Sequence, residues 1–225
     1  MKLHEDTVSS LLLEALKVIS ESPAFQDFNL VGGTCLSLQL GHRRSIDIDL
    51  FTDMEYGKMD TQAMKDFLCT HFSYTENLDS MNQRALGYSV RIGKSPIESV
   101  KADFFYTEKF IFPTFKVNGI RLADIREIAA MKIKAITEEE PRQKDFWDIY
   151  ELSNRFSLKD MIDWAIQRDQ WSVTERDIEK GFQNIFHVEE SNEGIDCYRG
   201  YEWELIRIDL KAMADEYFSS HKTND

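Results

Sequence analysis

Two aspartates, Asp47 and Asp49, stand at alternate positions in a segment that alternates between polar and apolar residues. Side chains at i and i+2 of a strand point to the same face, about 7 Å apart, so these carboxylates can hold a divalent cation but cannot pair with each other. Carboxylate oxygens suit Mg²⁺ or Mn²⁺, which bind phosphate-bearing substrates. The residues expected to face a core instead are Ile46, Ile48 and Leu50. Taken alone, the pair fits a solvent-facing Asp-Ile-Asp on an edge strand better, because charge on an outward face is common.

Two further features favour a phosphate chemistry. Gly32, Gly33 and Thr34 lie between an expected strand at 28–31 and an expected helix at 34–40. A glycine turn lets backbone N–H groups approach a phosphate, and a helix N-terminus favours anions. Asp103, on an expected strand at 98–106, is placed where a neighbouring strand could add a third carboxylate. Each feature alone has a simpler explanation, as an ordinary turn and as one exposed aspartate.

A phosphatase with an aspartyl nucleophile is the main alternative chemistry for an Asp-x-Asp strand. It requires a continuous apolar strand before the first aspartate and a Thr or Val two positions after the second. Here Arg43, Arg44 and Ser45 precede the pair, and Phe51 occupies the later position. The pattern therefore disfavours that reading.

The order of these features resembles the nucleotidyltransferase superfamily of DNA polymerase β. The segment GGTCLSLQLGHRRSIDIDLF resembles the first motif of the AbiEii/AbiGii toxin family of nucleotidyltransferases. Lys101-Ala-Asp103 is similar to the second motif, residues 128–135 with Lys132 to the third, and residues 144–150 with Asp145 and Asp148 to the fourth. The likeness covers about residues 25–155, and the later helices match only as a helical bundle.

The resemblance implies transfer of an NMP from an NTP to an acceptor hydroxyl, with release of pyrophosphate. It implies two Mg²⁺ ions, or Mn²⁺, held by Asp47, Asp49 and Asp103, with the acceptor hydroxyl activated at one of them. The residues expected to bind the nucleotide are Gly32, Gly33, Thr34, Arg44, Lys132, Asp145 and Asp148. Arg44 is chosen over Arg43 for proximity only. The acceptor is an RNA such as tRNA, a protein or a small molecule, and a cognate antitoxin is an expected partner.

The last motifs have a simple structural alternative. Lys132 and Lys134 alternate with apolar residues, and without the resemblance both would be interpreted as surface lysines. Asp145 and Asp148 share one helix face, where they either support the helix or bind base, ribose or acceptor. A non-catalytic protein that binds a nucleotide or a partner on the same fold is therefore the second function to consider.

The pattern predicts an α+β chain, with strands and helices over 1–121 and a helical bundle over 122–225. The resemblance implies that the first domain is of the nucleotidyltransferase type, with a mixed sheet. Strands are expected also at 45–51, 87–92 and 110–117. Helices are expected at 5–21, 60–72, 124–140, 144–155, 157–168, 174–187 and 200–220.

Composition limits the remaining classes. The 225 residues carry 27 Lys and Arg against 40 Asp and Glu, a formal net charge of −13, which disfavours nucleic-acid binding over the whole surface and docking on anionic membranes. Residues 101–150 carry nine groups of each sign, so basic groups are concentrated locally. No apolar run could span a bilayer, the N-terminus lacks a signal-peptide core, and three separated cysteines fit a reducing cytoplasm.

Overall fold

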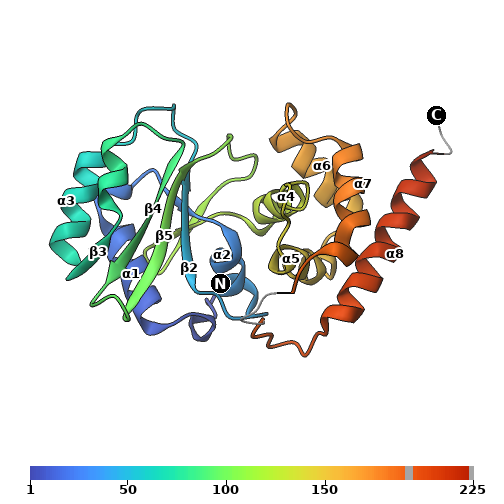
Figure 1. Ribbon diagram of the computed structural model, residues 1–225, viewed down its shortest axis with the longest axis horizontal. Coiled ribbons are helices and arrows are strands. Elements are labelled where there is room, and N and C mark those ends of the chain that lie inside the picture. The colour runs from blue at the N-terminus through green and yellow to red at the C-terminus, as the bar shows by residue number, and fades with distance from the viewer. Residues whose placement is uncertain (191–194, 223–225) are drawn as a thin grey trace. The chain divides into compact units, whose positions relative to one another are not determined.

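The computed structural model describes residues 1–190 and 195–222 (Figure 1). The chain divides into two compact units, Met1–Asp124 and Ile125–Asp225. The first contains a sheet with helices and the second is helical. The expected boundary after residue 121 lies inside the last strand of the first unit.

A mixed sheet is the centre of the first unit and confirms the predicted fold class. Within the described residues it has seven strands in the order β3-β4-β5-β2-β1-β7-β6. The pairs β2–β5 and β1–β7 are parallel and the other neighbours are antiparallel. The strands are β1 (Asn29–Leu30), β2 (Asp47–Thr52), β3 (Tyr74–Glu76), β4 (Gly87–Gly93), β5 (Ser99–Tyr106), β6 (Phe115–Val117) and β7 (Ile120–Leu122).

Side-chain caps explain where the helices of this unit begin. The helices are α1 (Ser10–Glu21), α2 (Gly32–Leu40) and α3 (Thr61–His71). The Ser9 hydroxyl accepts from the Leu12 N–H, so α1 begins at residue 10 and not at residue 5 as predicted. Asp60 caps α3 in the same way, by accepting from the Ala63 N–H.

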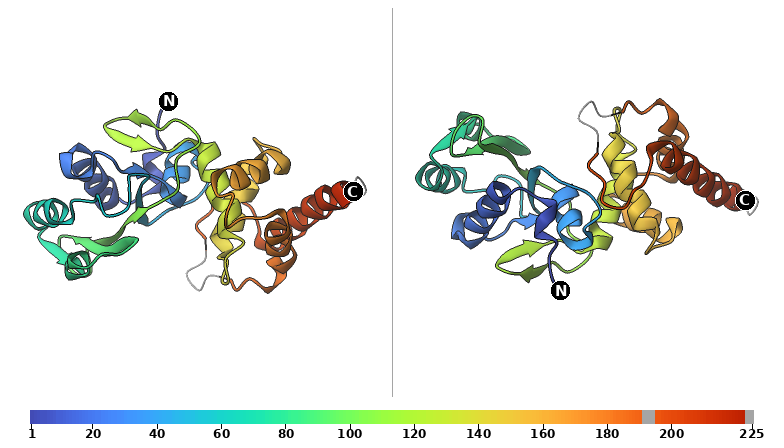
Figure 2. Two further views of the ribbon diagram at one scale, coloured as in Figure 1. Left: turned by 90° about the horizontal axis from the view of Figure 1, so that it is seen from above. Right: turned by 90° about the horizontal axis from the view of Figure 1, so that it is seen from below.

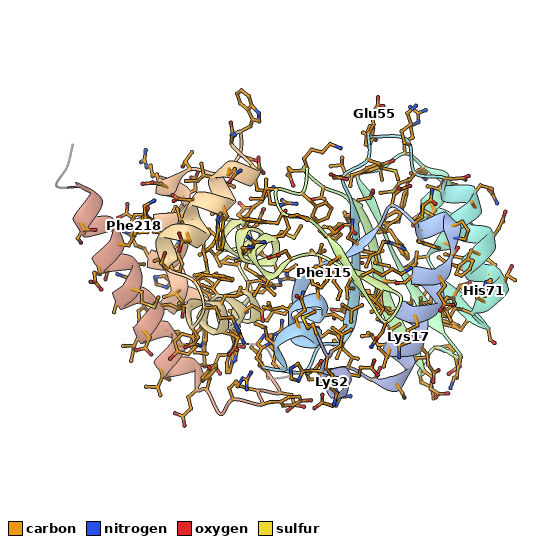
Figure 3. The ribbon with its side chains drawn as sticks, turned by 180° about the vertical axis from the view of Figure 1, so that it is seen from behind. Lys2, Lys17, Glu55, His71, Phe115 and Phe218 are labelled. Carbon is orange, nitrogen blue, oxygen red and sulfur yellow. The ribbon has the colours of Figure 1, made fainter. Side chains whose placement is uncertain are left out.

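One face of the sheet forms the core of the first unit. Ile48, Leu50 and Phe104 are buried there, and the rings of Phe25 and Phe28 lie 5.1 and 5.9 Å from that of Phe104. Figure 3 shows Lys17 on α1 and His71 on α3 at the outer side of this unit. The expectation that Ile46 also faces the core is wrong: β2 begins one residue later, and Ile46 is 55% exposed.

The far end of the sheet differs from the prediction. The expected strand at 110–117 is confined to β6, and β7 follows it through a tight turn in which Asn118 and Gly119 have φ of 49° and 86°. Strands of three residues, such as β3 and β7, are too short to be recognised from an alternation of polar and apolar residues.

The second unit is a bundle of helices. In the described part of the chain they are α4 (Ile125–Ala135), α5 (Gln143–Ser153), α6 (Leu158–Arg168), α7 (Glu175–Gln183) and α8 (Trp203–Lys222). α8 is the long red helix in Figure 2. α4 ends before the predicted residue 140, because three successive glutamates at 138–140 would place negative charge at the negative end of the helix dipole. Within residues 1–190 and 195–222, no helix is both long and apolar enough to cross a membrane.

Burial separates the three cysteine thiols. Burial raises the pKa of Cys35 to about 12, whereas Cys69 is exposed and Cys197 partly exposed. Because the thiolate is the reactive form, we expect a chromogenic aromatic disulfide to modify Cys69 and Cys197 in the native protein and Cys35 only after unfolding. A Cys35→Ala variant serves as the control, with unchanged native reactivity. Rapid native labelling of Cys35 would contradict this assignment.

Candidate active site

The parallel pairing of β2 with β5 brings the three predicted carboxylates onto neighbouring strands. The register sets Asp49 beside Asp103 and Asp47 beside Lys101. All four residues are partly exposed while the residues between them are buried, so they share the face opposite the core. The predicted approach of Asp103 to the Asp-x-Asp strand is therefore present in the sheet.

Both carboxylate oxygens of Asp103 have partners within the protein. Lys101 Nζ lies 2.6 Å from Asp103 Oδ2, and Ser89 Oγ on β4 donates to Asp103 Oδ1 at 2.6 Å. Among residues 1–190 and 195–222, no three His, Cys, Asp or Glu side chains are gathered in an arrangement that could hold a metal ion. The donor chemistry and the register suit a divalent cation, but Lys101 stands against the third carboxylate.

The pKa of Lys101 is affected by the charges of all three aspartates, Asp47, Asp49 and Asp103. Burial alone would lower the pKa of its ammonium, but the hydrogen bond and charge of Asp103 and the charges of Asp47 and Asp49 together raise it. Sequence reasoning counted Lys101 only among the basic groups of residues 101–150 that could serve an NTP or RNA, although its place two residues before Asp103 puts both side chains on one face.

Gly32 and Gly33 are the first two residues of α2. The sequence suggested that they form a separate turn before the helix, and this expectation is wrong. Gly32 has φ of +67°, and a Cβ there would collide with the Asp49 carboxylate. A Cβ on Gly33 would collide with the Arg43 guanidinium. The two glycines therefore allow a carboxylate and a guanidinium to approach the first turn of a helix closely.

Thr34 and Ser45 form hydrogen bonds at the start of β2, the strand that carries Asp47 and Asp49. The Thr34 hydroxyl donates to the backbone carbonyl of Asp47 and shares a hydrogen bond of 2.8 Å with the Ser45 hydroxyl. Thr34 is fully buried. Its hydroxyl therefore helps to position β2, and its contact with a nucleotide stays a prediction.

The two arginines before β2 have opposite environments. Arg43 is buried, lies against Gly33 and donates from a terminal nitrogen to the Arg44 carbonyl at 3.0 Å. Arg44, the predicted phosphate ligand, is exposed. Arg43 is therefore the arginine beside the glycine pair, and proximity in sequence could not distinguish the two.

In the second unit, Lys132, Asp145 and Asp148 form a buried cluster that joins α4 to α5. Lys132 Nζ lies 2.6 Å from Asp145 Oδ1 and 2.7 Å from Asp148 Oδ2. The alternative interpretation of Lys132 as a surface lysine is wrong, since its side chain is 6% exposed. Burial alone would raise the pKa of Asp145, but the charges of Lys132 and Arg142 outweigh it and lower that pKa.

Two more ion pairs in this unit escaped sequence reasoning. Arg168 Nε lies 2.5 Å from Glu127 Oε1, with both side chains buried, and Lys134 Nζ lies 2.5 Å from Asp169 Oδ2. Lys134 is thus not a simple solvated lysine either. Pairs this far apart in the chain leave no periodic signal in a sequence.

The predicted residues thus form two groups. The first unit holds the carboxylates, the glycines, Thr34 and Arg44, and the second holds Lys132 with its two aspartates.

A first prediction concerns Gly32. Gly32→Ala adds a clash with the Asp49 carboxylate to the strain of a positive φ, so we expect it to lower the free energy of unfolding by about 2–4 kcal/mol. Gly119→Ala is the matched control, because Gly119 also has positive φ but no atom lies within 4 Å of its Cβ position. It should cost about 1–2 kcal/mol. Equal losses in urea unfolding would contradict the close approach.

A second prediction concerns Lys132. Lys132→Met removes the cation that contacts both buried carboxylates, so it should destabilise the protein by about 3–5 kcal/mol at pH 7. The sign with pH follows from the pKa directions. In the wild type the lowered pKa of Asp145 gives stability above its ordinary 3.8 that is lost as the pH falls. In the variant, burial is opposed by less positive charge and raises the pKa of the carboxylates relative to the wild type, so stability is lost as the pH rises.

The free-energy gap between variant and wild type should therefore narrow toward pH 4 in chemical unfolding. Lys159→Met is the control, since Lys159 pairs with Asp163 at 2.5 Å on the surface and its loss should leave the free energy of unfolding almost unchanged. A gap that stays constant with pH would contradict the proposed charge balance.

Several known proteins are similar to this chain over more than nine-tenths of its length. An uncharacterised protein of Aquifex aeolicus (strain VF5) is 28% identical over 215 residues, which cover 92% of this chain and 96% of that one. A crystal structure of a candidate nucleotidyltransferase from H. pylori has a TM-score of 0.59 at 14% identity, covering 96% of this chain and 95% of its own. JHP933 from Helicobacter pylori has a TM-score of 0.57 at 16% identity, covering 99% and 98%. These two structures share the fold.

The family described as nucleotidyl transferase AbiEii toxin, type IV toxin–antitoxin system, matches residues 14–220. The match spans both units and includes all the motifs that carried the resemblance. The chain therefore belongs to the AbiEii family of nucleotidyltransferase toxins.

Proposed function

We propose that this protein transfers an NMP from an NTP to an acceptor hydroxyl and releases pyrophosphate, with Asp47, Asp49 and Asp103 at the reaction centre. The observation that carries the proposal is the β2–β5 register, which sets Asp49 beside Asp103 on the face opposite the core. Family membership supports the reaction class. The buried residues behind this face and the Thr34–Asp47 hydrogen bond support a fixed carboxylate geometry.

Divalent metal ions are the general cofactors of nucleotidyltransferases, and the residues present fit them in donor chemistry. Asp47, Asp49 and Asp103 would hold Mg²⁺ or Mn²⁺, in two ions as the family motifs imply. When bound, such ions neutralise the triphosphate and lower the pKa of the attacking hydroxyl.

The remaining motif residues are proposed to bind the nucleotide. The N–H groups at Gly32 and Gly33, in the first turn of α2, suit the β- and γ-phosphates. Arg43, buried beside Gly33, is better placed than the exposed Arg44 to add a cation there. Lys132 keeps its proposed role toward the triphosphate, with Asp145 and Asp148 holding its ammonium in the absence of a nucleotide.

The family description also supports a role as the toxin of a type IV toxin–antitoxin pair. We propose a cognate antitoxin as partner and the cytoplasm as the place of action, where NTP substrates are available. Either an RNA, such as tRNA, or a protein is proposed as the acceptor.

To test the function, the protein is incubated with Mg²⁺, one labelled NTP at a time, and total cell RNA, protein or metabolites. The measurement is the label incorporated into each fraction. We expect one fraction to become labelled, and Asp47→Asn or Asp49→Asn to reduce the labelling at least about 100-fold. Asp66→Asn, on the exposed surface of α3, is the matched control and should retain activity.

Full activity of Asp47→Asn or Asp49→Asn would overturn the proposal. Absence of transfer with all four NTPs by a folded protein would favour the alternative, a non-catalytic protein that binds a nucleotide or a partner on the same fold.

A further inference from the structure

Lys101 occupies an unusual place for a lysine on an exposed strand. In the register of β2 and β5, Asp47, Asp49, Asp103 and Lys101 form the four corners of one patch on the sheet. Neighbouring strands lie about 4.8 Å apart, so each corner is within reach of the long lysine side chain. Figure 1 shows β4, β5 and β2 side by side in this part of the sheet. The patch thus contains three carboxylates and one cation.

The contacts of Asp103 show how the patch is held. Ser89 donates to one of its oxygens from β4, and Lys101 contacts the other at 2.6 Å. Asp103 is only 14% exposed, so it has little freedom to turn away from its neighbours. Asp49 and Asp103 are like charges at directly paired positions on adjacent strands, which is destabilising unless cations lie near them.

Lys101 differs from Asp103 in its freedom to move. Its side chain is 42% exposed, and its flexible four-carbon stem can carry the ammonium into solvent. A surface ion pair of this exposure is weak, so its loss costs little when another cation takes over its partner. The carboxylate stays in place and the lysine is the displaceable member.

We propose that Lys101 is an internal counter-cation, which occupies the charge position of a divalent ion among Asp47, Asp49 and Asp103 and withdraws when such an ion enters. Lys101 is thus a positioning residue that keeps the carboxylates together without metal and sets the affinity for metal. This inference rests on the proposed function, because it assumes that the three carboxylates hold the divalent ion of the reaction.

The test is a Mn²⁺ titration of the full chain, followed by the electron paramagnetic resonance signal of the free ion. Lys101→Met should bind Mn²⁺ about tenfold more tightly than the wild type, because a positive charge a few ångströms from the site is gone. Lys101→Arg keeps the charge and should bind as the wild type does. Lys109→Met removes another aspartate-paired lysine of the first unit and should change nothing.

Two further measurements assign the effect to this patch. The gain should be absent from Lys101→Met combined with Asp49→Asn. In a chelator, Lys101→Met should melt at a lower temperature than the wild type, and added Mn²⁺ should raise its melting temperature by more. A merely structural lysine would lower the melting temperature without raising the affinity for Mn²⁺.

Equal Mn²⁺ affinity of the wild type and Lys101→Met would overturn the inference, as would a gain that survives Asp49→Asn. NMP transfer by the wild type, measured in parallel, separates the two proposals. Transfer without an affinity gain in Lys101→Met defeats the role of Lys101 alone. An affinity gain without transfer defeats the proposed function and leaves the counter-cation in place.

Discussion

Repulsion between carboxylates on one face of a sheet is the constraint on which the first unit depends. Asp49 and Asp103 are direct neighbours on parallel strands, and Asp47 is next along the same face. Such a cluster is stable only when cations balance it. The local structure follows: Lys101 and Ser89 engage Asp103, and the absence of a side chain at Gly32 leaves room for the Asp49 carboxylate.

The sequence could predict the parts of this arrangement that depend on local periodicity. Alternation at 45–51 and 98–106 placed the aspartates on polar faces, and the register confirms their approach. The motifs identified the family, which the match over residues 14–220 confirms. The catalytic and binding roles of the individual residues stay predictions, because position on a face does not establish chemistry.

Long-range packing decided what the sequence could not show. From sequence alone Lys132 would be interpreted as a surface lysine. In the fold, α5 packs against α4 and places two carboxylates beside its ammonium. Arg43 and Arg44 are adjacent in sequence, yet only the tertiary fold determines that Arg43 is buried beside Gly33. Thr34 was predicted to bind the nucleotide, and only the tertiary fold reveals that its hydroxyl donates to the Asp47 carbonyl on β2.

The two lysine–carboxylate clusters show why exposure matters more than distance for the role of an ion pair. Lys101 and Lys132 each lie 2.6 Å from an aspartate oxygen. The Lys132 side chain is 6% exposed. Removing its charge therefore leaves Asp145 and Asp148 buried with less positive charge beside them, so this cluster stabilises the fold. The Lys101 side chain is 42% exposed, and water can solvate its ammonium when another cation replaces it. The same contact is therefore costly to break in the buried cluster and weak in the exposed one.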